Sequence, residues 1–333
     1  MRKLIKTTII IFLILIVLNV VSRIRDGSVS NEESILLNEQ SCVDRGFEKI
    51  TIHVDGRERS VLWKGPEKWT KGAVIAMHGG GGDYTQWCYE SLRLVKPQVD
   101  FSDLAVERGF AVFLLESTND VVTDSGGLVC GKRWDATLVE GRTDNVDLPF
   151  IEQVITEIVP SKRPVGSSIN TFLTGESTGG YMAILTATHF DNLITAFAPV
   201  ASGDPYGTYF DCDPSLSLRE SAKGAGFDRE TNKQITEAGA CLPNAHFRDR
   251  SLETVSSNQK IPFKMFHSVD DGIVDISCQK KAEAMLVQQG YINDGAYVLL
   301  SQSSRNVWSH LWQAEYNIPV LDFFEKIGNE LMK

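Results

Sequence analysis

Residues 171–180 constrain the fold of this chain more than any other stretch. They read Thr-Phe-Leu-Thr-Gly-Glu-Ser-Thr-Gly-Gly, a short apolar run that ends in Gly-x-Ser-x-Gly, and a run that favours helix follows at 181–188. A strand, a sharp turn and a helix in this order place the Ser177 hydroxyl at the apex of the turn, and the flanking glycines let strand and helix approach closely. Ser177 is therefore a candidate nucleophile, although an ordinary glycine-rich turn would give the same pentapeptide.

Apolar runs alternate with helical patterns along the rest of the chain. The expected strands lie at 47–54, 60–63, 73–77, 110–115, 171–175, 193–200, 261–266 and 296–300. The expected helices lie at 101–108, 147–158, 181–188, 278–289 and 311–325. This alternation predicts an α/β fold with a mostly parallel, doubly wound sheet flanked by helices. In such sheets the functional residues gather at the carboxyl ends of the strands.

The domain organisation follows from changes in composition along the chain. Residues 26–45 are mostly polar and are expected to form a flexible leader, and 46–333 are expected to form one catalytic domain. A polar stretch at 202–260 interrupts that domain, with its best helix candidate at 229–238. A structureless loop of this length is uncommon in a compact domain. We therefore interpret 202–260 as an insertion that forms a lid over the strand ends, or else as a surface excursion.

The first 25 residues have the pattern of an export signal. Three basic residues precede an apolar run at 7–21. As a helix this run reaches about 22 Å, short of the roughly 30 Å bilayer core, which favours a cleaved signal peptide. Arg23 and Arg25 follow the run, so an uncleaved membrane anchor is the alternative. Either way we expect a secreted or periplasmic protein that touches a membrane only through this segment.

Charge and cysteine content restrict the partners. The net charge is −10 and no basic run lies outside the N-terminus, which argues against nucleic-acid binding. An even number of cysteines in an exported chain favours disulfide bonds. They are Cys42, Cys88, Cys130, Cys212, Cys241 and Cys278. Fifteen pairings are possible, with Cys212–Cys241 the first guess. None of the cysteines has metal-ligand spacing, so we expect no metal.

A serine nucleophile needs a base and an acid that orients the base. In enzymes that carry the serine on such a turn, the order along the chain is serine, acid, histidine. Of the six histidines, His310 follows the last predicted strand, in the loop where the base belongs. It is the candidate general base.

Three aspartates follow the predicted strand at 261–266. Asp275 is placed to cap the next helix. Asp270 and Asp271 both remain possible as the acid. Asp271 is preferred because it fits the pattern Gly-x-x-Asp-x-x-Val, with Ser268 in place of the glycine.

The glycine run at 78–82 follows a predicted buried strand and can supply backbone N–H donors. Together with the N–H of Thr178, the N–H of Gly80 is the expected oxyanion hole. The run contains neither Gly-Lys-Ser/Thr nor the start of a dinucleotide-binding helix, which argues against a nucleotide loop. We expect no cofactor.

These blocks together resemble the α/β-hydrolase superfamily and, within it, the polyhydroxybutyrate depolymerase and feruloyl esterase group. The matching blocks, spread over about 48–327, are 78–82 with Trp87 downstream, 130–134, 144–151, 175–182 and 309–312. Residues 175–182 are similar to that group's Gly-x-Ser-x-Gly-Gly-x-Met, and 309–312 to its Gly-His-x-Trp, with Ser309 in place of the glycine. Trp87, Trp134 and Trp312 are candidates to line the substrate pocket.

The resemblance implies an exported serine hydrolase that cleaves carboxylic esters through a Ser177–His310–Asp271 triad and an acyl-enzyme. Its substrates would be polyester, feruloyl or other acyl esters, possibly polymeric. A peptidase or lactone hydrolase of the same fold is the first alternative. A non-catalytic surface binding protein is the second, against which the complete set of catalytic residue types argues.

Overall fold

The computed structural model describes residues 31–117, 134–136, 145–205, 227–228, 233–234, 260–300 and 307–331. The export segment at 1–25, most of the insertion at 202–260 and the guessed pair Cys212–Cys241 lie outside the described residues. Among the residues described, none of the helices combines the length and the apolarity needed to cross a bilayer.

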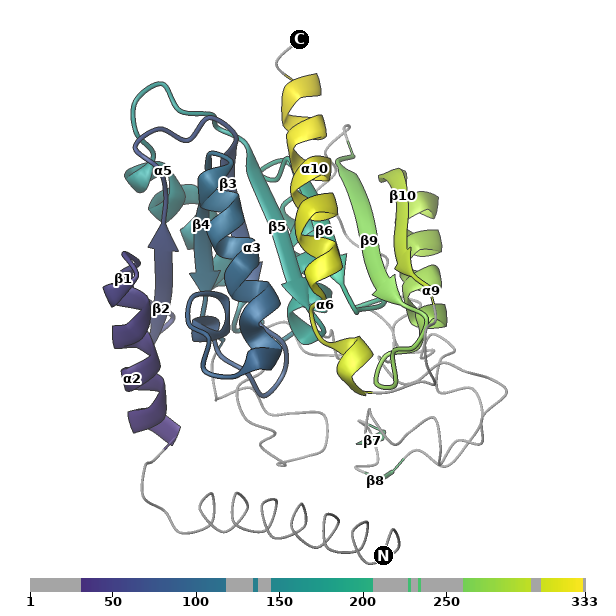
Figure 1. The fold of residues 1–333 in the computed structure, drawn as a ribbon. Helices are drawn as coiled ribbons and strands as arrows, with labels where there is room; N and C mark the ends of the chain where they lie inside the picture. Colours follow the sequence, from purple (N-terminus) through teal and green to yellow (C-terminus); the bar gives the residue numbers. More distant parts are fainter. Residues whose placement is uncertain are drawn as a thin grey trace, which may run out of the picture.

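An eight-stranded sheet forms the centre of the molecule, in the order β1-β2-β4-β3-β5-β6-β9-β10 (Figure 1). Its strands are β1 (Glu48–Val54), β2 (Arg57–Lys64), β3 (Gly72–Met77), β4 (Phe110–Leu115), β5 (Thr171–Glu176), β6 (Ala196–Val200), β9 (Pro262–Ser268) and β10 (Ile292–Leu299). The pairings of β2 with β1 and with β4 are antiparallel, and the pairings from β4 to β10 are parallel. The mostly parallel sheet predicted from the sequence is thus confirmed.

Helices cover both faces of the sheet (Figure 1). One face carries α3 (Lys96–Glu107) and α10 (Ala314–Glu330). Against the other pack α4 (Leu148–Gln153), α6 (Thr178–His189) and α9 (Ile276–Gln288). The helix expected at 147–158 is instead α4, a π-helical turn at Val154–Ile158 and α5 (Val159–Lys162), which contains Pro160.

The two faces enclose two hydrophobic cores, as the period-2 alternation of a strand requires. On β3, Ala73, Ile75 and Met77 pack with α6, while Val74 and Ala76 pack with α3 and α10. All six residues of β3 and of β4 are buried, which explains why both appear as continuous apolar runs. This doubly covered sheet is what fixes the positions of its strand ends.

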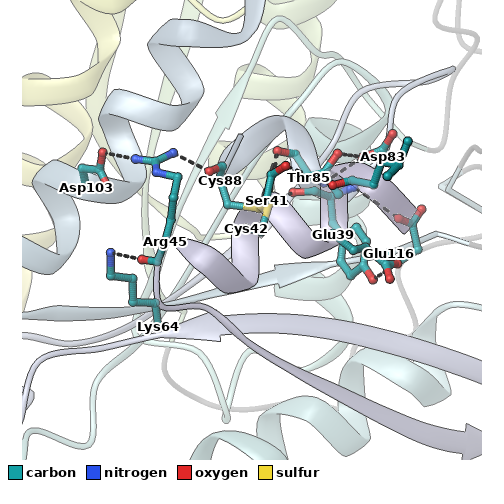
Figure 2. The surroundings of a disulfide bond; sticks show 12 residues. Glu39, Ser41, Cys42, Arg45, Lys64, Asp83, Thr85, Cys88, Asp103 and Glu116 are labelled. Carbon is teal, nitrogen blue, oxygen red and sulfur yellow. Dashed lines mark hydrogen bonds and ion pairs between the residues drawn. A yellow bond between two sulfur atoms is a disulfide. The ribbon is translucent and has the colours of Figure 1, made fainter. Parts of the chain in front are cut away.

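A helix stands where the sequence predicted a flexible leader. Helix α2 (Asn31–Asp44) is tied by a disulfide between Cys42 and Cys88 to the short helix η1 (Tyr84–Trp87) (Figure 2). Next to the bridge, Arg45 donates hydrogen bonds to the Cys88 carbonyl and, at 2.5 Å, to Asp103 of α3. The leader prediction is therefore wrong for these residues, because a covalent bond and distant contacts hold a segment that has little apolar periodicity of its own.

Cys278 at the start of α9 is also disulfide-bonded. Within the insertion, β7 (Phe227–Asp228) and β8 (Lys233–Gln234) form an antiparallel pair. Strand β8 lies within the helix candidate at 229–238, so that prediction is wrong at these two residues. The predicted lid otherwise falls outside the described residues.

Candidate active site

Ser177 lies between the end of β5 and the start of α6. Its φ of 52° and ψ of −121° place a non-glycine residue at positive φ, a conformation that costs free energy and is concentrated at functional sites. Its backbone N–H donates to the Val200 carbonyl at 3.0 Å, which fixes the turn to β6.

Two glycines make this turn possible. A Cβ atom on Gly175 would lie 2.5 Å from Gly179, and one on Gly179 would lie 2.3 Å from the Met77 carbonyl oxygen. Strand, turn and helix therefore pack at distances that only glycine allows. The Gly-x-Ser-x-Gly pattern is thus explained by packing as a nucleophile elbow.

His310 and Asp271 meet at the same edge of the sheet. Asp271 follows β9, and His310 ends the short helix η4 (Val307–His310). His310 Nδ1 lies 2.8 Å from Asp271 Oδ2, and both side chains are buried. Because a carboxylate accepts, Nδ1 carries the hydrogen and Nε2 is left able to take a proton. Asp271 is thus the carboxylate that orients His310.

The surroundings of this pair shift both of its pKa values. Burial raises the pKa of Asp271, but the charge of His310 and hydrogen bonds from His267 and His310 outweigh burial, so the pKa lies well below its usual range. Burial lowers the pKa of His310, but the charge and hydrogen bond of Asp271, with a further contribution from Glu176, raise it above 6.5. The pair favours an ionised acid and an imidazole that accepts protons readily.

The glycine run at 78–82 lies beside the elbow, as predicted. A Cβ on Gly80 would lie 3.2 Å from Thr178 Cγ2, and one on Gly79 would lie 3.7 Å from Ser177 Cβ. The two residues expected to form the oxyanion hole, Gly80 and Thr178, are therefore neighbours next to the candidate nucleophile.

The imidazole of His78 and the indole of Trp134 hold this loop in place. Ser117 N–H donates to His78 Nε2 at 3.2 Å, so Nδ1 carries the hydrogen and donates to the Gly79 carbonyl at 2.7 Å. Trp134 Nε1 donates to the His78 carbonyl at 2.8 Å. Local hydrogen bonds thus fix the backbone that would present the oxyanion donor.

The three tryptophans predicted to line a pocket lie in the protein interior. Trp87, Trp134 and Trp312 are at most 1% exposed. The rings of Trp87 and Trp312 are 4.8 Å apart, and both pack edge-on against Phe101. Their large apolar area stabilises the interior, and little of their surface is left for a substrate. The tryptophan that is exposed is Trp308, at 59%, in η4 two residues before His310.

Sequence reasoning missed Glu176, Gln98 and His267. Glu176 is a buried carboxylate next to the nucleophile, Gln98 donates to it at 2.9 Å, and His267 Nε2 lies 3.3 Å from Asp271 Oδ2. One signal was available, because Glu176 is the charged residue of a strand whose other residues are uncharged. Within the described part of the chain, no group of three or more His, Cys, Asp or Glu side chains is arranged to hold a metal ion.

Comparisons with known proteins find the same architecture. Neither a protein-family model nor a curated protein matches the chain. Among solved structures, an acylaminoacyl peptidase of Pyrococcus horikoshii matches 84% of this chain with a TM-score of 0.53 and 17% sequence identity. The chain spans 41% of that peptidase's length. The match with Est1E from Butyrivibrio proteoclasticus covers 85% of this chain and 97% of the Est1E chain, with a TM-score of 0.47 and 14% sequence identity.

The sheet order, the helices on both faces and the elbow after β5 agree with the fold expected from the sequence. The similarity to the peptidase supports the same conclusion. The chain has the α/β-hydrolase fold.

Proposed function

We propose that this chain is a serine hydrolase that cleaves carboxylic esters. The observation that carries the proposal is the 2.8 Å hydrogen bond between His310 and Asp271, at the same sheet edge as the Ser177 elbow. A serine on a strained turn, a histidine oriented by a buried carboxylate and adjacent backbone donors together form the machinery of acyl transfer.

In the proposed mechanism, Ser177 Oγ attacks the ester carbonyl carbon while His310 Nε2 takes the hydroxyl proton. Asp271 stabilises the imidazolium that forms, and the N–H groups of Gly80 and Thr178 stabilise the negative charge on the carbonyl oxygen. The alcohol leaves with the proton from His310, and an acyl-enzyme remains on Ser177. A water molecule, deprotonated by His310, then releases the acid and restores the serine.

The proposed substrates are polyester, feruloyl or other acyl esters, as the resemblance of the sequence blocks implies. We also propose that the enzyme acts outside the cytoplasm. The Cys42–Cys88 disulfide supports this, because structural disulfides persist in oxidising compartments. Its N-terminal apolar segment would serve as the signal or anchor.

A peptidase activity is the second candidate, because the solved structure with the higher similarity is named an acylaminoacyl peptidase. The two are separated by turnover of p-nitrophenyl esters and of N-acylated peptide amides at equal concentration. The ester proposal requires faster ester turnover, and faster amide turnover would favour the peptidase.

The test of a serine hydrolase is labelling with a fluorophosphonate. We expect the folded protein to form an adduct on Ser177 and the heat-denatured protein to form none. Ser177→Ala should abolish labelling and lower ester turnover about 10⁴-fold or more, and His310→Ala nearly as much. Ser161→Ala, on α5 at the other end of the sheet (Figure 1), is the matched control and should be labelled as strongly as the wild type. An unlabelled wild-type protein would contradict the proposal.

A further inference from the structure

Glu176 is a buried carboxylate directly before the candidate nucleophile. It ends β5 and is 6% exposed. Removing a carboxylate from water is costly unless hydrogen bonds replace the lost solvation. Glu176 Oε2 accepts the backbone N–H of Trp312 at 2.8 Å and the side-chain N–H of Gln98 at 2.9 Å. A side chain with these partners is held in one place.

Two of the neighbours of Glu176 belong to segments that the proposed mechanism brings together. Trp312 is two residues beyond His310, so the hydrogen bond to its N–H fixes the chain just after the base. On the other side, a Cβ on Gly79 would lie 3.2 Å from Glu176 Oε1, so the carboxylate also contacts the glycine run. This side chain of the nucleophile strand is therefore hydrogen-bonded to the His310 loop and lies beside the oxyanion loop.

Charge coupling adds a second argument. Burial raises the pKa of Glu176, while the charge of His310 and the hydrogen bond from Trp312 oppose the rise. For His310, burial lowers the pKa. The charge and the hydrogen bond of Asp271 raise that pKa most, and the charge of Glu176 raises it further. The imidazolium that forms during attack would thus be stabilised by Asp271 through a hydrogen bond and by the charge of Glu176.

We propose that Glu176 is a positioning residue, which holds the His310 loop against the nucleophile strand and places a second negative charge near the imidazole. The inference rests on the proposed function, because it assigns a role within the same site. Glu176 acts through His310 and does not touch the reacting atoms. It makes two separable contributions, one from geometry and one from charge.

Three variants separate geometry from charge. Glu176→Gln keeps the size and the accepting oxygen but removes the charge. Glu176→Asp keeps the charge but shortens the reach to Trp312 and Gln98. Gln98→Ala removes one hydrogen bond and leaves the carboxylate. Each variant is assayed for kcat and KM on a p-nitrophenyl ester across pH, and His310 is titrated by NMR.

For Glu176→Gln we expect kcat to fall about tenfold with little change in KM. The midpoint of the acidic limb of kcat should move to lower pH, and the NMR titration of His310 should move with it, because one negative charge has gone. Glu176→Asp and Gln98→Ala should lower kcat and leave the midpoint near that of the wild type. A role confined to packing would not move the midpoint.

An unchanged titration of His310 in folded Glu176→Gln would overturn the inference. If that variant does not fold, Glu176→Asp decides, because full kcat in it would exclude the positioning role. The NMR titration needs no turnover. The two proposals can therefore fail separately. If fluorophosphonate does not label the wild-type protein but Glu176→Gln still shifts the His310 titration, the proposed function is wrong and the coupling between Glu176 and His310 stands.

Discussion

Two regions of the candidate site each bury one carboxylate near His310, with opposite results. Asp271, after β9, is 1% exposed, and its pKa is lowered, because the charge of His310 and two histidine hydrogen bonds outweigh burial. Glu176, at the end of β5, is 6% exposed, and its pKa is raised because burial dominates. Burial is thus similar in the two regions and cannot explain the difference.

The difference lies in the His310 charge, which is in direct contact with Asp271, and in the hydrogen-bond donors that each carboxylate receives. Asp271 Oδ1 accepts the backbone N–H groups of Ile273 and Val274 at 2.8 and 2.9 Å, and Oδ2 faces His310 and His267. Glu176 receives the N–H of Trp312 and of Gln98, both on Oε2. Donors on both oxygens and the adjacent His310 charge lower the pKa of Asp271, whereas the pKa of Glu176, whose donors reach Oε2, is raised.

The largest effect should follow the loss of charge at Asp271. Asp271→Asn keeps the size but no longer stabilises the imidazolium, and we expect kcat to fall about 10³- to 10⁴-fold. Steady-state kinetics on an ester substrate measure this. Asp270→Asn, one residue earlier in the same loop, is the control. If kcat falls more in Asp270→Asn than in Asp271→Asn, then Asp270 is the acid of the triad and Asp271 is not.

Stability should change with opposite sign in the two regions. A carboxyl with a lowered pKa stabilises the fold above its ordinary pKa of 3.8 and loses that contribution as the pH falls. A carboxyl with a raised pKa, such as Glu176, destabilises the fold as the pH rises above its ordinary pKa of 4.5. Above the pH at which His310 loses its charge, Asp271→Asn should lose about 2 kcal/mol of unfolding free energy. Glu176→Gln should gain about 1 kcal/mol.

Denaturant unfolding of both variants, at that pH and near pH 4, measures the difference. The gain in Glu176→Gln should shrink at the lower pH, where Glu176 itself is protonated. Two variants that change stability in the same direction would contradict the contrast between the regions.

A smaller effect should follow the removal of one donor from Asp271. His267→Phe deletes the ring nitrogen that lies 2.8 Å from the Val274 carbonyl oxygen and 3.3 Å from Asp271 Oδ2, so Asp271 should lose part of what lowers its pKa. We expect the pKa of Asp271 to rise and kcat to fall about tenfold. His267→Gln can still present an N–H group and should recover part of the activity. Equal losses in both variants would point to packing as the role of His267.

The smallest expected effect is a shift in the pH dependence of the wild-type enzyme. Because His310 must be neutral to act as a base and its pKa is raised, the acidic limb of kcat/KM should have a midpoint above 6.5. Stopped assays of ester hydrolysis across pH give the midpoint. A value below 6.5 would show that burial outweighs the two carboxylates around His310.

The sheet was predictable where local pattern and burial coincide. Strand β4 was expected at the residues where it is observed, because it is continuously apolar and follows a helix stop at Gly109. Strand β10 was expected at 296–300 but begins at Ile292. Its first half contains Asn293, Asp294 and Gly295, which favour turns, and a register shift there accommodates them against β9. Pairing with a neighbouring strand overrode local preference.

The parts of the candidate site that depend on the order of residues along the chain were predictable. The order of strands and local motifs pointed to Ser177 and His310, and they favoured Asp271 while leaving Asp270 possible as the acid. The contacts of Glu176 did not, because Gln98 and Trp312 lie 78 and 136 residues away along the chain. The burial of Trp87, Trp134 and Trp312 was not predictable for a related reason, since residue type alone does not distinguish an interior ring from one that lines a pocket.

The backbone at Ser177 has a consequence for how variants of this protein are selected. A non-glycine residue at a φ of 52° carries a conformational cost of about 1–3 kcal/mol, which a glycine would not bear. Ser177→Gly should therefore melt at a higher temperature than the wild type while lacking the nucleophile. A selection that rewards heat resistance alone would favour this change and enrich inactive protein, so thermal screens of this chain need a turnover assay beside them.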